Sequence, residues 1–188
     1  MSFQTDLRYS HDQSDKEWWE KVYRDFFPNV EAIVDLRKNG WHQQAGRDRA
    51  IILSNGKTIY IDEKVRRIKD TGDILLEIWS TVSKENRFNR NPGWAIKDLD
   101  TDWIAYAFEP SQRLYMFNAL QLRQTLLNNY SHWEKLVEKK EQGFNLVVAD
   151  NGVYETHSWA IPTDVLYQAM AQASVMGWGV PEVASKVA

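Results

Sequence analysis

The stretch RDRAIILSNGKTIYIDEKVRR, residues 47–67, decides how this chain folds. Two runs rich in Ile, Leu and Tyr flank Asn55-Gly56, a dipeptide that strongly favours a tight turn between antiparallel strands. The stretch is therefore predicted to be a β-hairpin. Acidic residues stand near both of its outer ends, with Asp48 opening the first strand and Asp62 near the end of the second.

The length of the turn decides which of these side chains share a face of the sheet. With a two-residue Asn55-Gly56 loop, Asp48 lies opposite Glu63, so Asp48 and Asp62 point to opposite faces. With a three-residue loop over residues 54–56, Asp48 lies opposite Asp62 and shares its face with Asp62 and Lys64. The sequence permits both registers.

Both faces of the hairpin carry apolar residues, which predicts a sheet covered on both sides. Ile52 and Tyr60 lie on one face, and the residues at 51, 53, 59 and 61 lie on the other. The expected fold class is α/β, with a central mixed sheet built on this hairpin and flanked by helices.

Apolar periodicity and turn residues predict the other elements. Ser14 and Glu17 match a capping box that opens a helix over 15–27. The spacing of Val30, Ile33 and Val34 predicts a second helix over 29–39. The remaining expectations are strands at 73–80 and 102–108, a helix at 112–129 continued over 130–142, a hairpin at 144–149 and 154–161, and a helix at 163–176.

Bulk composition favours a globular domain. The chain has 188 residues, 43% of them hydrophobic, with a net charge of −3 and no cysteine. We expect one domain over 1–188, with loose ends at 1–13 and 178–188. The missing cysteines exclude disulfides and thiolate zinc sites. No signal-peptide or membrane-span pattern is present, so a cytoplasmic location is expected, and the oligomeric state, a homodimer included, stays open.

An acid–acid–lysine set at the end of a hairpin suits metal-dependent phosphodiester hydrolysis. Mg²⁺ prefers oxygen ligands and keeps several waters, so few carboxylates are needed to hold it. Asp48, Asp62 and the backbone carbonyl of Glu63 are the candidate ligands for Mg²⁺ or Mn²⁺. Lys64 is the candidate that orients the attacking water. The alternative is an ordinary hairpin with charged, solvated ends, in which Arg49 pairs with Asp62.

These motifs resemble the PD-(D/E)XK nuclease superfamily, which has the restriction-endonuclease-like fold. The resemblance rests on Gly46-Arg47-Asp48 opening a strand, on the Asn55-Gly56 turn and on Ile61-Asp62-Glu63-Lys64. The longer run from 44 to 80 is also similar to uncharacterised phage-type proteins thought to be nuclease-like. The chain departs from the family pattern at Arg47, where a proline is usual.

The resemblance implies a nuclease that hydrolyses DNA. It also implies that a helix before the hairpin supplies an extra acid, for which Glu31 is the candidate. Glu77, an acid inside an apolar strand, is expected to lie at an exposed end, beside a cation or near the metal. The alternative functions are an inactive nuclease-fold protein that binds DNA or a protein partner, and a structural or inhibitory phage-type protein whose aromatic surface contacts a host protein.

Two groups of cations are candidate phosphate contacts, and one aromatic ring is a candidate for stacking on a base. The first group directly follows the hairpin, and the second lies in a polar loop. The candidate nucleic-acid-binding residues are Arg66, Arg67, Lys69, Lys84, Arg87 and Arg90. Trp94, beside Pro92-Gly93, is the candidate stacking ring.

Overall fold

The structure is a computed structural model, and it describes residues 18–38 and 40–173. The first element in that part of the chain is α2 (Trp18–Phe26), within the helix predicted over 15–27. The predicted cap at Ser14 and the predicted loose ends at 1–13 and 178–188 lie outside the described residues.

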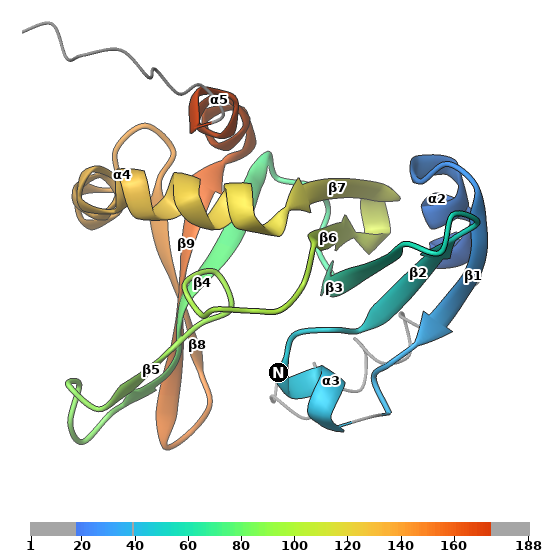
Figure 1. Ribbon diagram of the computed structural model, residues 1–188. Coiled ribbons are helices and arrows are strands. Elements are labelled where there is room, and N and C mark those ends of the chain that lie inside the picture. Colours follow the sequence, from blue (N-terminus) through green and yellow to red (C-terminus); the bar gives the residue numbers. More distant parts are fainter. Residues whose placement is uncertain (1–17, 39, 174–188) are drawn as a thin grey trace, which may run out of the picture.

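A five-stranded mixed sheet holds the predicted hairpin near its centre (Figure 1). Its strands are β1 (Val30–Asp35), β2 (Arg49–Leu53), β3 (Thr58–Arg66), β6 (Trp103–Phe108) and β7 (Arg113–Asn118), in the order β1-β2-β3-β6-β7. Strands β3 and β6 run parallel, and the other neighbours run antiparallel. The prediction of an α/β chain with a mixed sheet flanked by helices is confirmed.

The segment predicted as a helix over 29–39 is the edge strand β1, so that prediction was wrong. Val30, Ile33 and Val34 have helical spacing, but they are β-branched residues that suit a half-buried sheet surface. Pairing with β2 decides the outcome, because Ile33 lies opposite Ile51 on β2. A short helix, α3 (Gly40–Gln44), then leads into β2.

A second, antiparallel sheet of four strands was not expected as a separate unit. Its order is β5-β4-β9-β8, with β4 (Asp73–Ser83), β5 (Arg90–Pro92), β8 (Asn145–Asp150) and β9 (Tyr154–Pro162). The predicted strand at 73–80 and the predicted hairpin at 144–161 both form part of it. Figure 1 shows the hairpins β4–β5 and β8–β9 projecting together, away from the five-stranded sheet.

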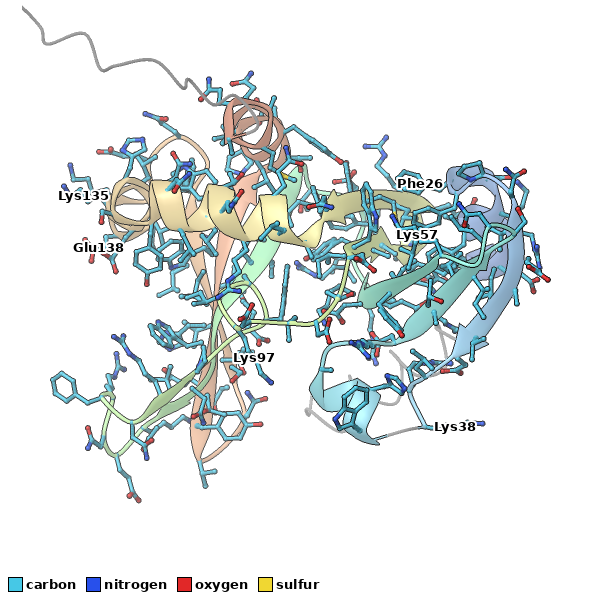
Figure 2. All side chains as sticks on the ribbon, in the orientation of Figure 1. Phe26, Lys38, Lys57, Lys97, Lys135 and Glu138 are labelled. Carbon is cyan, nitrogen blue, oxygen red and sulfur yellow. The ribbon has the colours of Figure 1, made fainter. Side chains whose placement is uncertain are left out.

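The segment predicted as a helix over 112–129 divides into a strand and a helix. Residues 113–118 form β7, which pairs with β6. Asn118 then caps α4 (Ala119–Lys139), because its side chain accepts the N–H of Gln121 at 3.0 Å. Helix α4 spans the two sheets along one side, and the last described helix, α5 (Thr163–Ala173), packs beside it (Figure 1). Lys135 and Glu138 project from α4 away from the sheets (Figure 2).

Buried side chains fill both sides of the five-stranded sheet. On one side, Trp19 and Tyr23 of α2 pack against Ile51 and Ile61, and all four are at most 2% exposed. On the other side, residues 104, 106 and 108 of β6 join a larger core made with β4, β9, α4 and α5. The sheet that contains the hairpin is therefore covered on both sides, by α2 at the hairpin and by the larger core at β6, as predicted.

No helix in the described part of the chain combines the length and the apolar character that crossing a membrane requires.

Candidate functional site

A three-residue turn sets the register of the β2–β3 hairpin. The N–H of Leu53 donates to the carbonyl of Lys57 at 2.9 Å, and Gly56 has a φ of +80°, a left-handed conformation that glycine adopts without strain. Arg49 consequently pairs with Ile61. Of the two registers that the sequence permits, the chain therefore adopts the three-residue one. Asp48 itself lies in the bend before β2, where the strand pairing has ended and its N–H donates to the carbonyl of Ile61.

Asp62 is a buried carboxylate of β3, with 2% of its surface exposed. Its Oδ1 accepts a hydrogen bond from Lys64 Nζ at 2.6 Å, whereas its Oδ2 is buried and has no hydrogen-bond partner. Burial raises the pKa of Asp62 to about 7; Lys64 opposes the rise, and the neighbouring charge of Asp48 adds to it. An acceptor left without a donor in this way suits a bound cation or a shared proton.

Asp48 is held beside Asp62 by the backbone of β3. The N–H of Glu63 donates to Asp48 Oδ2 at 2.8 Å, and the N–H of Asp48 donates to the carbonyl of Ile61 at 2.8 Å. Within an extended strand, the N–H and C=O of one residue point to the same side. The Glu63 carbonyl therefore points to the side of β3 on which the Asp48 carboxylate lies.

Lys64 remains a cation in this setting. Burial lowers the pKa of its ammonium group, but the carboxylates of Asp62, Asp48 and Glu77 outweigh burial, and the net shift of the pKa is upward. The ammonium also lies 5.6 Å from the centroid of the Trp94 ring. A charged donor is thus fixed between the two acids of the hairpin and a third acid on β4.

Glu77 reaches the site from β4, the strand that begins the second sheet. Burial raises the pKa of its carboxyl group, while Lys64 and a hydrogen bond from the Trp94 N–H, at 3.4 Å, oppose the rise. The segment that carries Trp94 can lie this close to Glu77 because residue 93 is a glycine: a Cβ there would lie 2.2 Å from the Glu77 carbonyl oxygen. Of the three places expected for Glu77, the structure shows the one beside a cation, which is Lys64.

The side chain of Glu63 lies on the reverse face of the sheet, away from the paired acids. Its Oε1 accepts hydrogen bonds from Tyr23 Oη at 2.8 Å and from Arg49 Nε at 3.0 Å. Burial raises the pKa of Glu63, against the charge of Arg49. Arg49 thus forms an ion pair with Glu63 and lies 3.9 Å from a carboxylate oxygen of Asp35. The alternative of an Arg49–Asp62 pair is wrong, because these two side chains lie on opposite faces of the sheet.

Glu31 does not reach the acids. It is an exposed residue of β1, and β2 lies between β1 and β3 in the sheet. Its expected place rested on the predicted helix over 29–39, which is this strand. Tyr23 is instead the side chain that connects the preceding helix, α2, to the strand bearing Asp62 and Lys64.

The two groups of predicted phosphate contacts do not form one patch. The first group runs from the last residue of β3 into the loop before β4, and the second runs from the turn after β4 to the first residue of β5. Eleven residues of strand separate the groups by on the order of 30 Å. Individual members are also engaged within the protein: Arg66 donates to Tyr106 Oη at 3.0 Å, Lys84 pairs with Asp150 at 2.6 Å, and Arg90 stacks 3.9 Å from the Trp79 centroid.

The residues present fit a site with few protein ligands. In the part of the chain that the structure describes, no group of three or more His, Cys, Asp or Glu side chains is arranged to hold a metal ion. Asp48, Asp62 and the Glu63 carbonyl supply oxygen donors, and Mg²⁺ is commonly held by one or two carboxylates with water. The partnerless Oδ2 of Asp62 is the atom that argues for such a fit.

Comparison of the chain with protein-family models, with curated proteins and with solved structures finds no match.

Proposed function

We propose that this chain is a Mg²⁺-dependent nuclease that hydrolyses DNA phosphodiester bonds and has a restriction-endonuclease-like fold. One observation carries the proposal: the Asp48 carboxylate, which accepts the N–H of Glu63, lies near the buried Asp62 carboxylate that Lys64 contacts. A hairpin that served only as a structural unit would gain nothing from two neighbouring acids of which one, Asp62, is buried, because desolvation and mutual repulsion both disfavour ionisation of Asp62.

Each residue has a definite role in this proposal. Asp48, Asp62 and the Glu63 carbonyl hold the metal ion, which, when bound, polarises the phosphoryl oxygen and lowers the pKa of a bound water. The Lys64 ammonium orients the attacking water and stabilises negative charge that develops on the phosphate. Glu77 adds to the charges of Asp62 and Asp48 that keep Lys64 protonated. Tyr23 and Arg49 fix Glu63 from behind and so hold β3 in place.

The experiment is cleavage of plasmid DNA with Mg²⁺ or Mn²⁺ by the wild type, Asp62→Ala and Lys64→Ala. We expect Asp62→Ala to abolish cleavage and Lys64→Ala to slow it by roughly 100- to 1000-fold. Matched controls are Lys57→Ala, at the exposed β2–β3 turn (Figure 2), and Asp164→Ala, an exposed residue of α5. Cleavage that is equal in the wild type and both site variants would show that the site assignment is wrong.

A second candidate is a nuclease-fold protein that binds DNA or a protein partner without cutting DNA. The observation that favours it is the ion pair between Lys64 and Asp62, since a lysine at 2.6 Å competes with a cation for the same carboxylate. Salt-sensitive DNA binding without cleavage under either metal would support this function over hydrolysis.

A further inference from the structure

An aromatic and cationic stack lies at one end of the acidic site. Tyr60 precedes Asp62 by two residues on β3, so both side chains lie on the same face, about 7 Å apart along the strand. The Arg47 guanidinium lies 4.0 Å from the centroid of the Tyr60 ring and 5.1 Å from the centroid of the Trp41 ring. The stack therefore begins beside Asp62 and ends at Trp41.

The inner part of the stack is rigid. Arg47 is 8% exposed, its Nε donates to the Asp100 carbonyl at 2.8 Å, and its guanidinium pairs with the Asp100 carboxylate. The backbone N–H of Arg47 also donates to the carbonyl of His42 at 2.9 Å, which ties α3 to the start of β2. These contacts hold the α3 segment in a set position relative to Asp48.

Trp41, the outer ring of the stack, is 64% exposed. Leaving an indole in water forgoes a large favourable burial, so an exposed indole in a set position is suited to a ligand with a flat aromatic surface. Trp94, the ring expected for this role, is half-buried and packs against the large core instead. Arg47 is neutralised by Asp100, so the stack offers a flat surface more than a charge.

We propose that Trp41 stacks on an unpaired base about two nucleotides from the phosphate that a metal ion at Asp48 and Asp62 would hold, so that the preferred substrate is single-stranded DNA. This inference rests on the proposed function. Tyr60, the inner end of the stack, lies about one nucleotide of an extended strand from Asp62. Trp41 lies farther out, beyond the Arg47 guanidinium, so the base at its ring belongs to a nucleotide about two positions from that phosphate. In a continuous duplex that base would first have to leave its neighbours, at an energetic cost.

The test is binding with Ca²⁺ in place of Mg²⁺, because Ca²⁺ also takes oxygen ligands and keeps a cation at the acids; the length of each probe is checked on a denaturing gel after the measurement. The probes are fluorescein-labelled dT20, a 20-base-pair duplex and a 20-unit abasic strand, and the readout is fluorescence anisotropy. We expect the wild type to prefer dT20 to both other probes. Trp41→Ala is expected to lose roughly 5- to 100-fold in affinity for dT20, the cost of one base–aromatic stack, and to change little with the other probes.

Two further variants and one measurement separate stacking from general damage. Trp41→Phe keeps a ring and is expected to retain most of the affinity for dT20. Phe88→Ala removes a ring that is 94% exposed at the β4–β5 turn and is expected to have no effect. The salt dependence of dT20 binding is expected to have the same slope in the wild type and Trp41→Ala, because a base contact displaces no counterion.

The proposal is overturned if Trp41→Ala binds dT20 as the wild type does, if it loses affinity equally for all three probes, or if the wild type binds none of them. Failure of the nuclease assignment looks different, because dT20 binding would then still depend on Trp41 while no DNA is cut with Mg²⁺ or Mn²⁺. Cleavage of duplex DNA that is insensitive to Trp41→Ala would remove this inference and leave the nuclease in place.

Discussion

Raising the pH from 5.5 to 7 is expected to destabilise the metal-free protein, and Asp62 is the cause. Its carboxyl has a pKa of about 7 in the folded state and near 3.8 in the unfolded chain. Between these values the folded state holds one more proton, so unfolding releases that proton and becomes more favourable as the pH rises. The stability contributed by this proton is complete below pH 3.8 and is lost by about pH 7.

The magnitude follows from the same two pKa values. The free energy of unfolding falls by about 1.4 kcal/mol per pH unit while only the folded state is protonated. From pH 5.5 to 7 the expected loss is on the order of 2 kcal/mol, which is a large fraction of the stability of a typical domain. Above pH 7 both states are ionised at this position, and the Asp62 contribution becomes flat.

The assay is urea denaturation of the wild type and Asp62→Asn at several pH values from 5 to 8.5, in EDTA. Asparagine cannot ionise, so the difference between the two free energies of unfolding isolates Asp62 from the other buried acids, Glu63 and Glu77. Asp35→Asn is the control: a hydrogen bond from Arg37 lowers the pKa of Asp35 to about 2, so its contribution is lost only as the pH falls from about 3.8 to about 2. If Asp62→Asn and the wild type lose stability in parallel, Asp62 ionises at its ordinary pKa in the folded state and the reasoning is refuted.

Three further results are expected. At pH 8, Mg²⁺ raises the melting temperature of the wild type in a concentration-dependent way but leaves Asp62→Asn unchanged, because the ion binds the ionised carboxylate; an equal rise in both places the ion elsewhere. Tyr23→Phe removes a hydrogen bond to a buried carboxylate and lowers the free energy of unfolding by about 1.5–3 kcal/mol in urea denaturation; a loss below about 0.5 kcal/mol contradicts that role. Gly93→Ala forces a Cβ into the backbone of β4 and destabilises by about 1–3 kcal/mol, whereas Gly40→Ala, whose Cβ meets nothing within 4 Å, changes little in the same assay.

Local signals predicted the hairpin well. The Asn-Gly turn, the alternating apolar residues and the acids at its ends are all short-range features of 47–67. The sequence left two registers open because Ser54 can belong either to the strand or to the loop. The chosen register depends on the hydrogen bond from Leu53 to Lys57 and on how the two faces pack, and neither can be read from the turn residues alone.

Tertiary pairing explains the elements that were assigned wrongly. Val30, Ile33 and Val34 fit a helical face as well as a strand, and β2 provides a partner that local spacing does not reveal. Residues 113–118 became a strand in the same way, because Leu114 and Phe117 pair with β6 instead of continuing the apolar stripe of α4.

Local sequence patterns do not predict the buried hydrogen bonds among Tyr23, Glu63 and Arg49. Tyr23 and Glu63 are 40 positions apart in the chain and meet across the sheet. A tyrosine on the apolar face of a helix and a glutamate within an apolar strand are weak signals individually, and only the fold brings them together. The same holds for the stack at Arg47 and Trp41, which depends on the path of the chain through α3.

The three-residue turn also means that the alignment of the acids depends on a count of residues more than on any one of them. Losing or gaining a single residue between Leu53 and Lys57 would shift the pairing of β3 with β2 by one residue, so that the Asp62 side chain would no longer come to the same place relative to Asp48. The sequence would still contain every residue of the site. Apart from Gly56, whose φ of +80° favours glycine, substitutions in this turn are therefore expected to be tolerated far more readily than changes in its length. We expect homologues to differ in the other residues of the loop and to agree in the number of residues.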